Sequence, residues 1–203
     1  GDTAAHWYWP PPQSGGTAPA AHAAFDTVAK ALGRVDTLVN SAAIYPRRPI
    51  LEISDDDWDA SNAINVKGTY HMMVAAIRHM QAQDLVGRVR GRIVNITSVD
   101  AFKAHPQNAH YAATKAALQN MVLSFAEKYA PTVHVNGILP GLLILKEGGD
   151  EAYRQQTLKK ALLEFEPGAG PLIETVKYLL ESQYSTGSQV VINGGRHLKN
   201  RMT

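Results

Sequence analysis

Apolar residues recur along the chain at two spacings, one typical of amphipathic helices and the other typical of buried strands. Ser54, followed by three aspartates, is a helix start signal, and Gly33 is a helix stop signal. The helical spacing predicts five helices, over residues 18–33, 55 to about 80, 108–130, 151–164 and 171–182.

Short runs rich in branched apolar residues separate these helices and predict strands. They read VDTLVN at 35–40, GRIVNITS at 91–98, VHVNGIL at 133–139 and QVVIN at 189–193. Strands that alternate with helices in this way favour right-handed crossovers and a mainly parallel sheet covered on both faces. The sequence therefore predicts an α/β fold with a doubly wound, Rossmann-like sheet.

Polar or turn-forming residues stand where three of the predicted strands end. Asn40 ends the first strand, Ser98 ends the second, and Pro140 with Gly141 follows the third. In open parallel sheets, ligands bind outside the carboxyl ends of the strands. We therefore expect these residues to line one crevice.

The predicted helix over 108–130 carries Tyr111 and Lys115 four residues apart, so both side chains share one face. An ammonium group beside a phenol favours the phenolate and lowers the pKa of the tyrosine, which suits a general acid or base. The alternative interpretation is a packed ring beside a solvated amine. The spacing of Tyr111 and Lys115 alone does not decide between a general acid or base and a packed ring beside a solvated amine.

Composition narrows the range of partners. A chain of 203 residues with 45% apolar content can bury a core, and we expect one domain over 1–203, with 1–24 irregular or linker-like. A net charge of +2 predicts neither nucleic-acid nor membrane binding, so small molecules and like subunits are the expected partners. The absence of cysteine and of long apolar runs suits a cytoplasmic protein. No two histidines lie four apart on one predicted helix, and no metal site is expected.

Residues 25–199 resemble the short-chain dehydrogenase/reductase family, whose motifs occur here in the family's order. Ser98, Tyr111 and Lys115 have the family's spacing, and Asn65 lies at the position of its helix asparagine. The remaining matches are Asn40-Ser41-Ala42-Ala43 for the NNAG segment, Pro140-Gly141 for the PG motif, and STGSQVVINGG for the C-terminal segment, in which Asn193 replaces Asp.

The resemblance implies a nicotinamide-dependent hydride transfer to a C=O or C=N group, with Tyr111 as the proton donor. By the same resemblance, Ser98 would hold the substrate, Lys115 would lower the pKa of Tyr111 and bind the cofactor ribose, and Asn65 would hold a water molecule. NADP(H) is favoured over NAD(H). The implied cofactor-binding residues are Asn40, Ala42, Tyr111, Lys115, Pro140 and Gly141. The family also implies a homo-oligomer, a tetramer or dimer built on the helices over 55–80 and 108–130.

Two stretches resemble the pteridine reductase-like members of the family, including the bacterial dihydromonapterin reductases. In NSAAIYPRRP, Tyr45 and Pro46 would border a flat heterocycle. The segment after Gly141, with Leu143, resembles their substrate loop, so Tyr45, Leu143 and Ser98 are the expected substrate contacts. Such reductases usually carry Asp at the position of Ser98, which keeps a ketone or 3-oxoacyl substrate as the alternative.

The family's glycine-rich cofactor turn is not found in residues 1–24, where Gly15-Gly16 follows three prolines and has the composition of a flexible linker. We expect that the chain is an incomplete record of a complete enzyme. The alternative is a cofactor-free relative that acts as a binding or assembly protein, in which the aromatic stretch HWYW would cover exposed core.

Overall fold

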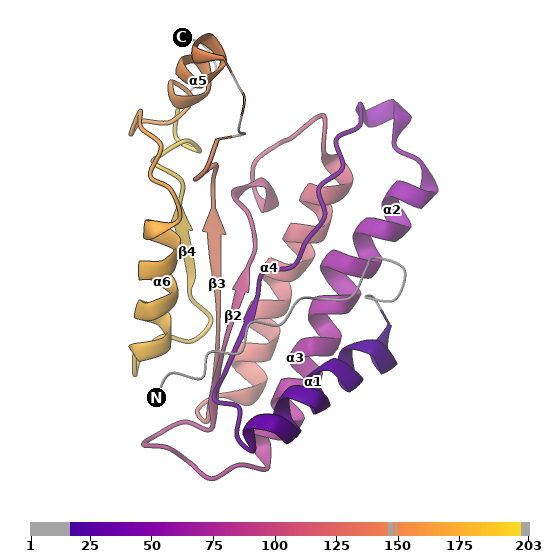
Figure 1. Cartoon of the computed structure of the whole chain (residues 1–203), viewed down its shortest axis with the longest axis vertical. Helices are drawn as coiled ribbons and strands as arrows, with labels where there is room; N and C mark the ends of the chain where they lie inside the picture. The colour runs from indigo at the N-terminus through magenta and orange to yellow at the C-terminus, as the bar shows by residue number, and fades with distance from the viewer. Residues whose placement is uncertain (1–16, 146–147, 149, 200–203) are drawn as a thin grey trace.

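Four parallel strands form one sheet in the computed structural model, which describes residues 17–145, 148 and 150–199. The sheet order β1-β2-β3-β4 follows the chain, and all strands point to the same end of the molecule (Figure 1). The strands are β1 (Thr37–Asn40), β2 (Gly91–Ile96), β3 (Val133–Pro140) and β4 (Gln189–Ile192). The predicted Rossmann-like α/β architecture is confirmed.

Helices connect the strands as the apolar spacing predicts. They are α1 (Ala18–Leu32), α2 (Asp55–Ser61), α3 (Thr69–Gln81), α4 (Ala109–Tyr129), α5 (Glu151–Leu158) and α6 (Gly170–Glu181). Two short 3-10 turns, η1 (Ile50–Glu52) and η3 (Val99–Ala101), precede α2 and α4. Ser54 caps α2 in a reciprocal pair of hydrogen bonds with Asp57, and Gly33 ends α1 at a φ of 71°. Both predicted boundary signals are confirmed.

Three features differ from the sequence-based expectation. The helix predicted over 55–80 is continuous but contains a π-helical segment, η2 (Asn62–Gly68). The helix predicted over 151–164 ends at Leu158, because the N–H groups of Leu162 and Leu163 bond to the carbonyl of Gly194 instead of continuing the helix. Helix α1 already begins at Ala18, so the irregular stretch predicted over 1–24 does not extend to residue 24. The predicted linker at Gly15-Gly16 and the HWYW stretch lie outside the described residues.

The apolar core has two parts, one on each face of the sheet. Helices α1, α3 and α4 enclose the larger part, in which Met73, Met80 and Ile93 are fully buried (Figure 1). Helix α6 covers the other face through Leu179, against Val94 and Ile138. The sheet is therefore covered on both faces around β2 and β3, which fixes the strand ends that carry the candidate site.

Strand β1 forms an edge of the sheet and is much less covered. Val39 is 41% exposed, although it lies within a strand. A cleft of about 630 Å³ runs along this edge between α1, β1 and η2. Its lining includes Phe25, Leu38 and Met72, and at one end Asn40 and Ala42.

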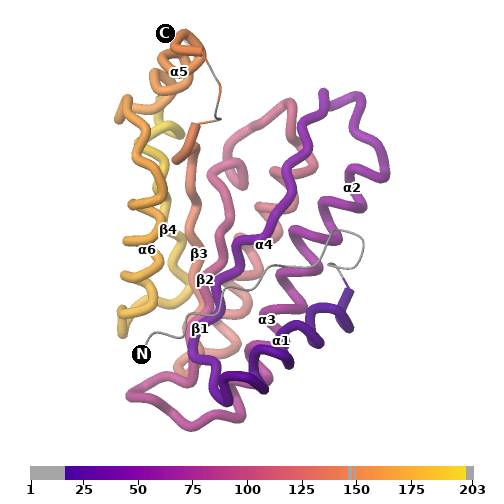
Figure 2. Tube along the Cα trace, in the orientation of Figure 1, coloured from indigo at the N-terminus to yellow at the C-terminus, as the bar shows by residue number. Residues whose placement is uncertain are grey.

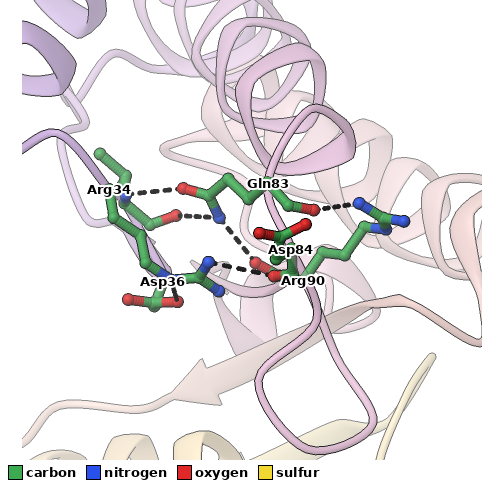
Figure 3. A network of polar contacts seen from close by, with 6 residues as sticks. Arg34, Asp36, Gln83, Asp84 and Arg90 are labelled. Carbon is green, nitrogen blue, oxygen red and sulfur yellow. Dashed lines mark hydrogen bonds and ion pairs between the residues drawn. The ribbon is translucent and has the colours of Figure 1, made fainter.

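A polar network around Gln83 holds the amino end of β1 (Figure 3). Its Oε1 accepts from Val35 N at 2.8 Å, and its Nε2 donates to the carbonyls of Val35 at 3.2 Å and Arg90 at 2.8 Å. Arg34 adds a hydrogen bond to the carbonyl of Asp84 at 3.0 Å. The turns before β1 and β2 are thereby tied together at the end of the sheet opposite the candidate site.

Within the described residues, none of the helices combines the length and the apolar character that crossing a bilayer requires.

Candidate active site

Ser98 and Tyr111 meet at the carboxyl end of β2. Ser98 follows the strand, is 7% exposed and caps η3 by accepting a hydrogen bond from Asp100 N at 3.1 Å. Tyr111 lies in the first turn of α4, and the Ser98 side chain lies close enough to its phenol to affect the pKa of that phenol. The strand end thus places a hydroxyl donor beside a phenol.

The surroundings of Tyr111 raise the pKa of its phenol. Burial is the largest cause, and the negative charge of Asp100 and the neighbouring Tyr45 act in the same direction, whereas the neighbouring Ser98 side chain lowers the pKa. Lys115 is not among the causes of this shift, and its predicted lowering of the Tyr111 pKa stays a prediction. The phenol is therefore held in its protonated form, the form that can donate a proton.

Lys115 lies one turn from Tyr111 but does not bond to the phenol. Its ammonium nitrogen is 5.6 Å from the centroid of the Tyr111 ring and donates to the carbonyl of Ile96 at 2.9 Å. Lys115 is 2% exposed, and this burial lowers its pKa from 10.5 to about 8. An ammonium has three N–H donors, so those not used on Ile96 remain available to a ligand.

Asn65 lies in the π-helical segment and is fully buried. Its side-chain amide holds the backbone of Ile44, accepting from the N–H at 2.8 Å and donating to the C=O at 2.9 Å. The same amide nitrogen donates to Thr114 Oγ1 at 3.1 Å, and the Asn65 carbonyl accepts from Thr69 Oγ1 at 2.9 Å. The water-binding role that the family resemblance implies for Asn65 stays a prediction.

The loop after β1 brings an aromatic ring to the site. Tyr45 is 65% exposed, and its ring lies edge-on to the Tyr111 ring with centroids 6.2 Å apart. Figure 2 shows the segment between β1 and α2 running past α4, and Arg48 N bonds to the carbonyl of Gln107 at 3.0 Å. The position of Tyr45 suits the predicted contact with a flat substrate.

Among the residues predicted to bind the cofactor, Asn40 has a structural partner. Its amide donates to Asn95 Oδ1 at 2.8 Å and so ties the end of β1 to β2. Ala42 is exposed and, with Asn40, lines one end of the cleft along β1. A ligand in this cleft would contact Asn40 and Ala42 together.

The turn after β3 depends on close packing. Gly141 N donates to the carbonyl of Ile192 at 3.0 Å, and a Cβ atom at Gly141 would lie 2.5 Å from the Cβ of Asn193. Pro140 pairs with Ile192 in the ladder between β3 and β4. The half-buried Leu143 follows, and its carbonyl accepts from Gly168 N at 3.1 Å. This segment forms a separate wall of the strand-end region.

The structure thus brings Ser98, Tyr111, Lys115 and Asn65 into one connected group of contacts. Two further residues that the sequence interpretation missed belong to it, Thr114 and Asp100. Thr114 directly precedes Lys115, and Asp100 follows Ser98 by two residues, so proximity to the motif was the only signal in the sequence.

Comparison with known proteins agrees with this geometry. The family model for short chain dehydrogenase matches residues 16–146. Dihydromonapterin reductases from Klebsiella pneumoniae and Citrobacter koseri are 43% and 42% identical to this chain over 113 residues, which is 56% of this chain and 47% of each relative. The chain spans about half the length of these curated relatives.

Solved structures agree in fold. Gluconate 5-dehydrogenase from Burkholderia cenocepacia, in complex with NADP and tartrate, superposes with a TM-score of 0.82 at 28% identity, over 91% of this chain and 73% of that chain. Acetoin dehydrogenase from Enterobacter cloacae superposes with a TM-score of 0.78 at 28% identity, over 91% and 72% of the two chains. With its family motifs assembled at the ends of parallel strands, the chain belongs to the short-chain dehydrogenase family.

Proposed function

We propose that this chain carries the proton-donating part of a nicotinamide-dependent reductase that acts on a pteridine. The observation that carries this proposal is the half-buried Tyr111 phenol, whose pKa is raised mainly by desolvation and lowered by the neighbouring Ser98 side chain. A proton donor of this kind suits the reduction of a C=N or C=O group, because negative charge develops on the nitrogen or oxygen as the carbon is reduced.

Each residue of the candidate site is assigned a different role according to its position. Ser98 is placed to hydrogen-bond the substrate atom that receives the proton, and Tyr111 to donate that proton from its phenol. Burial lowers the pKa of Lys115 to about 8, and an anionic ligand beside the ammonium would raise this pKa again. Tyr45 offers an exposed ring edge-on to the phenol, where a flat heterocycle would stack.

The described residues fit a nicotinamide cofactor in two respects. The Lys115 ammonium has donors beyond the one used on Ile96, which suits ribose hydroxyls, and Asn40 and Ala42 line a cleft that opens beside the strand ends. A reduced nicotinamide would supply the hydride, because no side chain can do so. NADP is the form bound by the gluconate 5-dehydrogenase relative, and we propose it for this chain.

The pteridine substrate is supported by the 43% identity to a dihydromonapterin reductase. A ketone is the second candidate, because Ser98 stands where pteridine reductases usually carry Asp, and because the similar solved structures include an acetoin dehydrogenase. The predicted homo-oligomer and the predicted cytoplasmic location stay predictions.

The test measures oxidation of NADPH and of NADH by the purified protein with three substrates: a 7,8-dihydropterin, a small ketone and a 3-oxoacyl thioester. The proposal predicts the highest kcat/KM for the dihydropterin with NADPH. Preference for the ketone or the thioester would replace the pteridine with the second candidate. No oxidation of either cofactor, together with no cofactor binding by calorimetry, would contradict the reductase proposal and favour a binding or assembly protein.

A further inference from the structure

A short chain of hydrogen bonds crosses three of the elements that build the candidate site. It begins at the backbone of Ile44, in the loop after β1, passes through the Asn65 side chain in η2 and reaches Thr114 in α4. From Thr114 it ends at the backbone carbonyl of Tyr111, which the Thr114 hydroxyl reaches at 2.7 Å. All three elements are far apart in the sequence, so these bonds fix their relative positions.

Thr114 both accepts and donates in this series of hydrogen bonds, and it does so through a single oxygen atom. Its Oγ1 accepts from Asn65 Nδ2 at 3.1 Å and uses its single hydrogen on the carbonyl of Tyr111. The side chain is 1% exposed, so water cannot readily replace either bond. A valine would fill the same volume and could do neither.

The Asn65 amide depends on this hydroxyl for its orientation. The two N–H bonds of Nδ2 go to Thr114 and to the carbonyl of Ile44, while Oδ1 accepts from the N–H of Ile44. If Thr114 could not accept, one N–H of a fully buried amide would lose its partner, which weakens the restraint on the amide and on the Ile44 backbone that it holds.

The residues at the two ends of this series of hydrogen bonds lie beside two aromatic rings of the candidate site. Tyr45 directly follows Ile44, and its ring meets the ring of Tyr111 with centroids 6.2 Å apart at an angle of 65°. The hydrogen bonds therefore hold the backbone next to both rings.

We propose that Thr114 is a positioning residue, whose hydroxyl locks Asn65 and, through it, the loop of Ile44 and Tyr45 against the proton donor Tyr111. The expected effect on turnover rests on the proposed function. The restraint itself, which we call the Thr114 lock, consists of the hydrogen bonds of Thr114 with Asn65 and with the Tyr111 carbonyl, and it is a property of the fold. Thr114 touches no reacting atom and acts through Asn65 and the Tyr111 backbone.

The test compares Thr114→Val, which keeps the volume, with Thr114→Ser, which keeps the hydroxyl, in the full protein. Thr114→Val is expected to lower kcat about tenfold with KM within about twofold of the parent, the size typical of losing a supporting hydrogen bond. Thr114→Ser is expected to restore kcat to within about twofold of the parent. Ser124→Ala removes an exposed hydroxyl from the same helix and serves as the matched control.

A second measurement does not depend on turnover. The Ile44 N–H bonds to Asn65, so hydrogen exchange at this amide is expected to accelerate about tenfold in Thr114→Val and to stay unchanged in Thr114→Ser. If Thr114→Val does not fold, Thr114→Ala replaces it, with the same expectation.

Parental kcat and parental exchange in Thr114→Val would overturn the proposal. An equal loss of kcat and an equal acceleration of exchange in Thr114→Ser would also overturn the proposal, because the lost hydroxyl would then not be the cause of either effect. If the parent protein shows no turnover, the proposed function fails, and the exchange of the Ile44 amide alone decides whether the Thr114 lock exists.

Discussion

Strands β3 and β1 belong to the same sheet but are held in different ways. Residues 133–139 of β3 are buried throughout, between α4 on one face and α6 on the other. Along β1, by contrast, exposed and half-buried residues alternate, and one long side borders the cleft. Apolar packing on both faces holds β3 in place, whereas β1 lacks such cover and depends on other interactions.

Polar side chains take over this task at both ends of β1. Gln83 binds the backbone of Val35 just before the strand, and Asn40 binds Asn95 at its last residue. The contrast teaches that the proton-donating group of the site, which contacts β2 and α4, rests on a packed core. The proposed cofactor end, at Asn40 and Ala42, rests on a few hydrogen bonds.

The largest expected effect is a difference in the free energy of unfolding between a variant in β3 and a variant in β1. Ile138→Ala in β3 removes a fully buried side chain and should lower the free energy of unfolding by about 2–5 kcal/mol. Val39→Ala in β1 should cost less than about 1 kcal/mol, because Val39 is 41% exposed. Urea denaturation of both variants measures the difference, and equal costs would mean that β1 is covered in solution.

A smaller effect concerns the buried charge of Lys115. Its pKa is lowered from 10.5 to about 8, so the folded state carries an unfavourable charge below pH 8, and this cost disappears as the pH rises toward 10.5. Lys115→Met should raise the free energy of unfolding by about 1–3 kcal/mol at pH 7, with a smaller gain at higher pH. Urea denaturation at pH 7 and pH 9.5 checks this. A gain that did not shrink with pH would show that the charge is not its source.

The smallest effect is a shift in a pH profile. The negative charge of Asp100 raises the pKa of Tyr111, and a phenol that donates a proton must be protonated. In Asp100→Asn this pKa should fall, so the loss of kcat at high pH should begin at a lower pH than in the parent. Asp100→Glu keeps the charge and should keep the parental profile. A shift toward higher pH in Asp100→Asn would contradict the assigned sign.

The regular elements could be predicted because local signals and apolar spacing agree. Gly33 ends α1 and Ser54 caps α2 as expected, and the four strands match the predicted runs, with β3 extending one residue further to Pro140. The π-helical segment could not be predicted, because its residues have an ordinary helical pattern and the distortion accompanies a tertiary contact between Asn65 and Ile44. The end of α5 depends likewise on Gly194, which is distant in the sequence.

For the candidate site, the sequence motif predicted which side chains come together but not how they interact. Lys115 was expected to act on the Tyr111 phenol, yet it bonds to the Ile96 carbonyl, and burial dominates both pKa values. Thr114 escaped notice because a threonine inside a helix usually bonds only to its own turn. Its second partner, Asn65, lies 49 positions away.

The central claim is that Tyr111 donates the proton, and one substitution tests it most directly. Tyr111→Phe should lower kcat for the preferred substrate by about 10²–10⁴-fold, the contribution typical of a general acid. Tyr70→Phe removes a hydroxyl from an exposed ring on α3 and should keep kcat within about twofold of the parent. Circular dichroism should show both variants folded. A folded Tyr111→Phe variant with parental kcat would contradict the account.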